Sequence, residues 1–120
     1  MNVLVRMSVT NRYRQGKTKT VCLVRHIRNP NAVLENIDEL ELRNKIQNNL
    51  VTKNNFEKTK EVIFTHEIIS DNNTNNSYIS IDSYSTEVYE DRDQILKTLL
   101  DKMYVCFNIS NEMILEKYSH

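Results

Sequence analysis

Residues 2–27 read NVLVRMSVTNRYRQGKTKTVCLVRHI, and this stretch decides the fold. From its start, apolar side chains recur at every second position, at Val3, Val5, Met7 and Val9. That spacing puts them on one face of a β-strand. Residues 18–27 repeat the alternation, and the polar segment before them holds the only glycine, Gly16. Because glycine adopts the positive φ that hairpin turns need, residues 2–27 predict a β-hairpin.

Two later stretches have the three- and four-residue spacing of amphipathic helices. The first, 31–50, follows an Asn-Pro-Asn run that favours a helix start. The second, 92–107, carries an apolar stripe made of Ile95, Leu96, Leu99, Leu100, Met103 and Phe107. A break at Asn108 is expected to separate it from a short last helix over 111–118.

Two further strands are expected after the first helix. Residues 61–70 are rich in β-branched and aromatic types. Residues 77–89 alternate, with two isoleucines on one face and two tyrosines on the other, and the asparagine-rich run 71–76 is a turn by composition. The chain therefore predicts an α+β fold of ββαββα type: a four-stranded antiparallel sheet, helices on one face and a short C-terminal helix. Its length fits one domain, 1–120.

The composition limits the class of protein. Sixteen basic residues balance sixteen acidic ones, so no overall field draws the chain to nucleic acid or to a membrane. Neither a signal peptide nor a membrane-helix pattern is present, which favours a cytoplasmic protein. Asn, Lys, Ile and Tyr have A- and T-rich codons, and their abundance suggests a phage or mobile element of an AT-rich host. The location would then be the host cytoplasm.

The two charge signs are separated along the chain. Residues 1–30 contain seven basic residues and no acidic one, whereas residues 61–90 contain six acidic residues and no basic one. One hairpin is therefore cationic and the other anionic. This separation is the only unusual feature that bears on function.

The cationic hairpin predicts a nucleic-acid contact. The candidate residues cluster around its turn and are Arg12, Tyr13, Arg14, Lys17 and Lys19. Guanidinium groups bind phosphate, and an exposed tyrosine can stack on a base. The expected partner is nucleic acid or a protein that works on nucleic acid, and no membrane.

Three other interpretations stay open. The two hairpins could be neighbours in one sheet, where cross-strand pairs of opposite charge help to fix register. They could also meet across a homodimer interface. Finally, an acidic face could imitate nucleic acid and make the protein an inhibitor of a host enzyme. The residues of that face would be Asp82, Glu87, Glu90, Asp91 and Asp93.

No catalytic motif is present, so an enzyme, such as a small hydrolase or nuclease, is the third choice. Cys106 with His66 is an example of a nucleophile pair that spacing allows. Cys22 and His26 would lie about 13 Å apart on a strand, which is too far for a shared metal. Neither a metal nor a cofactor is expected. Two cysteines are also too few for a disulfide framework, so Cys22 and Cys106 are expected to be reduced thiols that fill apolar positions.

Overall fold

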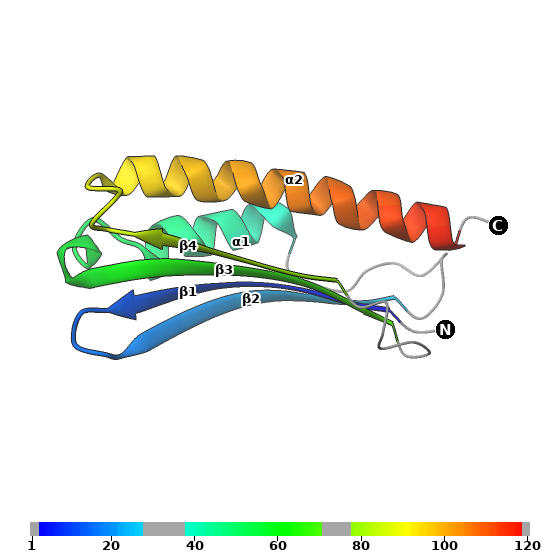
Figure 1. Ribbon diagram of the computed structural model, residues 1–120, viewed down its shortest axis with the longest axis horizontal. Coiled ribbons are helices and arrows are strands. Elements are labelled where there is room, and N and C mark those ends of the chain that lie inside the picture. The colour runs from blue at the N-terminus through cyan, green and yellow to red at the C-terminus, as the bar shows by residue number, and fades with distance from the viewer. Residues whose placement is uncertain (1–2, 28–37, 71–77, 119–120) are drawn as a thin grey trace.

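The computed structural model describes residues 3–27, 38–70 and 78–118. Four antiparallel strands form one sheet in the order β2-β1-β3-β4. The strands are β1 (Val3–Tyr13), β2 (Thr18–Ile27), β3 (Thr59–Ser70) and β4 (Tyr78–Ser85). The helices α1 (Glu39–Lys45) and α2 (Arg92–Tyr118) lie over the same face of the sheet (Figure 1). The expected α+β fold, a four-stranded antiparallel sheet with helices on one face, is confirmed.

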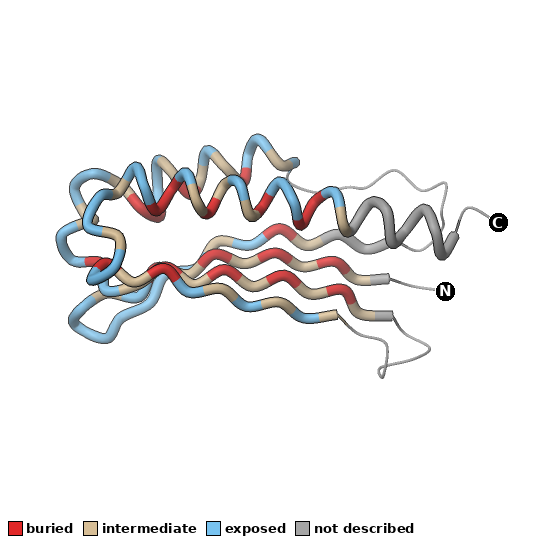
Figure 2. Tube along the Cα trace, turned by 45° about the horizontal axis from the view of Figure 1, so that its top comes forward, coloured by how far each residue is buried: buried red, intermediate tan, exposed pale blue. Residues whose placement is uncertain are grey.

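The core lies between the sheet and the helices. Alternate side chains of β1 and β3 point to the helices, as the alternation of buried and half-buried positions in Figure 2 shows. The sheet contributes Met7, Val9, Leu23, Val62, Phe64 and Tyr84, and the helical layer contributes Leu42, Ile46, Leu50, Ile95, Leu99 and Met103. Each fully buried apolar side chain contributes about 1.5–3 kcal/mol, so this layer carries most of the stability.

The first helix begins later than its hydrophobic pattern predicts. Residues 31–37 lie outside the described residues, and Asp38 has extended backbone, so α1 starts at Glu39. The Asp38 carboxylate accepts a hydrogen bond of 2.7 Å from the backbone N–H of Glu41. This is a side-chain N-cap, and it fixes the start of the helix. After Lys45 the chain continues as a single π-helical turn, η1 (Ile46–Leu50).

The last helix is longer than expected. Residues 111–118 are helical, but they continue α2 without a break at Asn108, so the separate short helix predicted there is wrong. The apolar stripe of α2 is confirmed, because five of its six predicted members are buried and the sixth, Leu100, packs against the core. The expected strand 77–89 ends at Ser85, and a turn then leads into α2. The turn expected at 71–76 lies outside the described residues.

Candidate functional site

The turn between β1 and β2 is a compact loop that Gly16 makes possible. The N–H of Gly16 donates to the carbonyl of Tyr13 at 2.9 Å, and the N–H of Tyr13 donates to the carbonyl of Lys17 at 2.8 Å. Gly16 has a φ of 92°, in the left-handed region that favours glycine. This geometry leaves Arg14 and Lys17 exposed at the end of the sheet.

The connector between η1 and β3 lies against this turn. The N–H of Arg14 donates to the carbonyl of Lys58 at 2.8 Å, and the side chain of Asn55 donates to the Tyr13 hydroxyl at 3.4 Å. Two segments that are far apart in the chain therefore meet at one end of the sheet. The exposed cations there form what we call the basic end: Arg14, Lys17, Lys19, Lys53, Lys58 and Lys60.

The two arginines of the outward face of β1 are paired with acids on β3. Arg12 lies 2.9 Å from a carboxylate oxygen of Glu61, and Arg6 lies 4.0 Å from one of Glu67. A hydrogen bond from the Ser83 hydroxyl, together with the one from Arg12, lowers the pKa of the Glu61 carboxyl. The interpretation that the two hairpins are neighbours in one sheet is thus confirmed, and Arg12 is not a free cation.

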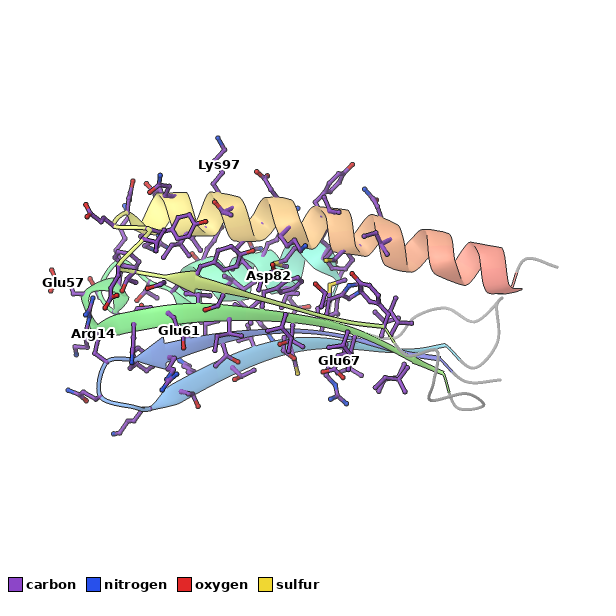
Figure 3. All side chains as sticks on the ribbon, in the orientation of Figure 1. Arg14, Glu57, Glu61, Glu67, Asp82 and Lys97 are labelled. Atoms are coloured by element: carbon purple, nitrogen blue, oxygen red, sulfur yellow. The ribbon has the colours of Figure 1, made fainter. Side chains whose placement is uncertain are left out.

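Two other predicted contact residues already have structural roles. Arg14 donates from Nε to the carbonyl of Glu57 at 3.3 Å and from Nη2 to the Thr86 hydroxyl at 3.2 Å, and Figure 3 shows Arg14 and Glu57 together at this end. It therefore links the hairpin turn to the connector and to the chain after β4. Tyr13 is half-buried and its hydroxyl is engaged by Asn55, so its ring is not a free stacking platform.

The lysines are less constrained. Lys19 reaches the carbonyl of Asn49 at 3.4 Å and remains exposed. Lys17, Lys58 and Lys60 take part in no ion pair with any residue that the structure describes. Sequence reasoning missed the lysines of the connector, because only the pairing of β1 with β3 brings them beside the turn.

A buried polar network holds the basic end in place. The Asn11 amide, fully buried, donates at 3.0 Å both to the carbonyl of Leu50 and to the Thr59 hydroxyl. Arg92, at the start of α2, donates to the carbonyl of Val51 at 2.6 Å and to that of Gln47 at 2.7 Å. These donors satisfy carbonyls at the end of η1 that have no partner within the helix. Sequence reasoning missed both residues.

An open cleft of about 580 Å³ extends from the basic end along α2. Its lining is formed by Gln47, Asn48, Thr52, Lys53, Arg92, Asp93, Leu96 and Lys97. The guanidinium of Arg92 is already occupied by the η1 carbonyls, so Lys53 and Lys97 are the cations that this cleft presents to solvent.

The residues of the predicted acidic face lie at two separate sites. Glu87, Glu90, Asp91 and Asp93 gather at the start of α2, where a carboxylate of Asp91 accepts from the N–H of Asp93 at 3.1 Å. Acids at that position cap the helix and complement its dipole. Asp82 lies instead between β4 and α2 (Figure 3), 3.5 Å from Lys102. Lys102 is about 15 Å along α2 from its start.

The candidate nucleophile pair, Cys106 and His66, lacks the pKa shift that activates a catalytic cysteine. Burial raises the pKa of the Cys106 thiol, whereas nucleophilic cysteines have a lowered pKa. Burial and the charge of Lys102 lower the pKa of His66 to about 4, and the His66 ring meets that of Tyr78 edge to face at 5.3 Å. Both cysteines are reduced thiols, and Cys106 is buried as expected. Cys22 is exposed because it lies on the outward face of β2, so the expectation that it fills an apolar position is wrong.

The acidic residues at the start of α1 form ion pairs within the helix. Glu39 lies 2.9 Å from Arg43, and Glu41 lies 3.8 Å from Lys45. Among the described residues, no three His, Cys, Asp or Glu side chains gather as metal ligands would. A bilayer crossing needs a long apolar helix, and neither α1 nor α2, as far as they are described, meets that requirement.

Comparison of the chain with protein-family models, with curated proteins and with solved structures found no match.

Proposed function

We propose that this protein binds nucleic acid, without catalysis, through the basic end. The observation that carries the proposal is the meeting of two segments whose exposed cations outnumber the acids there. Glu57 is the one acid among the connector's exposed residues, whereas Arg14, Lys17, Lys19, Lys53, Lys58 and Lys60 are all cationic. The pairing of Arg6 and Arg12 with glutamates removes these two arginines of β1 from the available positive charge.

The chemistry of the basic end favours phosphate over base recognition. Lysine ammonium groups bind phosphate as mobile point charges, and such contacts carry no sequence information. Tyr13, the aromatic residue of the turn, has its hydroxyl bound to Asn55, which limits stacking on bases. The proposed contact is therefore with the backbone of DNA or RNA, and its affinity should depend strongly on salt.

The test is the binding of labelled DNA and RNA, single- and double-stranded, followed by fluorescence anisotropy over a range of salt concentrations. Each phosphate neutralised contributes about −0.9 to the slope of log affinity against log salt for B-DNA. We expect Lys17→Glu combined with Lys58→Glu to weaken binding at least about tenfold at low salt and to reduce the slope by about two. Both side chains are exposed, so the fold should survive.

The matched control is Lys45→Glu, which makes the same change of charge on α1, outside both the basic end and the cleft. It should alter affinity much less than Lys17→Glu or Lys58→Glu alone. An affinity that changes neither with salt nor with the Lys17 and Lys58 substitutions would rule the proposal out.

Our second proposal is that the protein inhibits a host enzyme, and purification of the protein and its variants from host cells tests it. Glu87 and Glu90 are exposed beside the start of α2. A host protein that stays bound after nuclease treatment, and that Glu87→Lys with Glu90→Lys releases, would favour this alternative over nucleic-acid binding.

A further inference from the structure

The face of the sheet opposite the helices is not covered by any described element (Figure 1). Its side chains are those that point away from the core, and they include Ile79 and Ile81 on β4, which are 60% and 65% exposed. Large apolar side chains at these positions are unusual for a face that only meets water. Cys22, on β2, is exposed on the same face. We call this surface the open face.

The strand register arranges the open face in rows that run across the four strands. In one row Arg6 of β1 stands between Val24 and Glu67, and Ile79 follows Glu67 on β4. The row is therefore apolar, basic, acidic and apolar in turn. At the other end of the sheet the corresponding row consists of Thr18, Arg12, Glu61 and Ser85. It is hydroxyl, basic, acidic and hydroxyl in turn.

In the two rows between them, the outer side chains also match each other, and so do the inner ones. One runs Cys22, Ser8, Thr65 and Ile81, and the other runs Thr20, Thr10, Ile63 and Ser83. Their outer members match each other, a thiol with an isoleucine and a hydroxyl with a hydroxyl. Their inner members are small or β-branched, so they permit close approach of another surface.

In each row, the first side chain is thus complementary to the fourth, and the second is complementary to the third. A twofold axis that runs parallel to the strands, midway between β1 and β3, reverses every row. It places Arg6 of one copy over Glu67 of the other, and Val24 over Ile79. An axis across the strands would instead stack β1 on β1 and oppose like charges, which is unfavourable. Charge complementarity therefore selects one symmetric arrangement of two copies.

The area of the open face is sufficient for such a pair. Strands lie about 4.8 Å apart and rise about 3.4 Å per residue, so the face covers about 600 Å². Two copies would bury about 1,200 Å² in total, the lower limit for a specific interface. Sheets that pack face to face keep their strands within about 30° of each other, which preserves the opposition of the central rows.

We infer that a second copy of this chain packs on the open face, forming a homodimer in which β1 of each copy lies over β3 of the other. The Arg6–Glu67 and Arg12–Glu61 pairs become alternating groups of four charges, and the β4 isoleucines are covered by β2 of the partner. Because the axis is parallel to the strands, both basic ends lie at the same end of the dimer. The inference does not depend on nucleic-acid binding.

The test is the mass of the protein in solution, measured by sedimentation equilibrium without nucleic acid over a wide range of concentration. The wild-type chain should sediment as a dimer. Ile81→Lys should raise the dissociation constant of the dimer by about ten- to a hundredfold, because it buries an unpaired charge at the interface. Since Ile81 is exposed in a single copy, the substitution should leave the fold intact, as circular dichroism would show.

A cross-link tests the arrangement itself. In the proposed dimer, Cys in the variant Ile81→Cys lies opposite the partner's Cys22, about 10 Å away, so a short bis-maleimide should join two chains. The control is Ile81→Cys with Cys22→Ser, which should not form the cross-linked dimer. A wild-type chain that remains monomeric would overturn the inference. A dimer whose dissociation constant is unchanged by Ile81→Lys would also overturn it, since that dimer would use another surface.

Discussion

Arg92, at the start of α2, caps the end of η1, a helix in another part of the chain. Its guanidinium donates to the carbonyls of Val51 and Gln47, at the end of η1, and its side chain is only 15% exposed. We expect Arg92→Met, which keeps the apolar stem, to lower the free energy of unfolding by about 1–3 kcal/mol, because two carbonyls lose charged donors. Urea denaturation measures the change.

The conservative variant and a neighbour provide the controls for Arg92. Arg92→Lys should recover part of the loss, since an ammonium can still donate to one carbonyl. Lys97→Ala, on the exposed side of the same helix, should change the free energy of unfolding by less than about 0.5 kcal/mol. A loss no larger in Arg92→Met than in Lys97→Ala would show that the η1 carbonyls do not need Arg92.

His66 makes the stability depend on pH in the mildly acidic range. Its pKa falls from the ordinary 6.5 to about 4, because burial and then Lys102 disfavour the charged ring. The unfolded chain therefore takes up a proton at a higher pH than the folded chain. The stability that the neutral ring provides is complete above pH 6.5 and is lost as the pH falls toward 4, a change of about 3 kcal/mol at one pKa unit per about 1.4 kcal/mol.

The measurement is the free energy of unfolding of the wild-type protein and of His66→Gln at several pH values from 7 to 4. Carboxylates titrate in both proteins, so the difference between the two curves isolates His66. The wild-type advantage should shrink steadily across that window. A constant difference would mean that His66 has the same pKa in the folded and unfolded chains.

At the scale of the elements, the β1–β2 hairpin depends on its glycine. A Cβ at position 16 would meet no atom within 4 Å, so crowding is absent, but the φ of 92° is unfavourable for any residue with a Cβ. Gly16→Ala should therefore destabilise the fold by about 1–2 kcal/mol, and Gly16→Asn by less, because asparagine tolerates the left-handed region better. Thermal unfolding gives both values. An alanine variant as stable as the wild type would refute this account.

Elements with a strong period could be predicted from the sequence, and elements decided by a competition between local signals could not. The alternation of β1 and the apolar stripe of α2 were sufficient to place both. The start of α1 was missed because Asp38, a good N-cap, lies inside an otherwise helical pattern. The break at Asn108 was wrong because an interior asparagine costs little, whereas a continuing helix gains a hydrogen bond for each residue added.

At the scale of the whole molecule, the strand order determines where the charges meet. The sequence shows a cationic and an anionic hairpin, and the order β2-β1-β3-β4 places the inner strand of each beside the other. Arg6 and Arg12 are therefore neutralised across β1 and β3, while the turn and the connector keep their lysines exposed. Strand order depends on packing over the whole domain, so the candidate site could be predicted only in part: its turn, but not the lysines of the connector.

The central position of β1 also has a consequence for how the protein is made. β1 is paired with β2, its neighbour in sequence, on one side and with β3, far later in the chain, on the other. While a ribosome is still adding the residues between them, the nascent hairpin exposes a full row of unpaired backbone groups along β1. Such an edge can recruit the same strand of a neighbouring nascent chain. Slow translation of the stretch before β3 should therefore favour misassembly, and rapid delivery of β3 should protect against it.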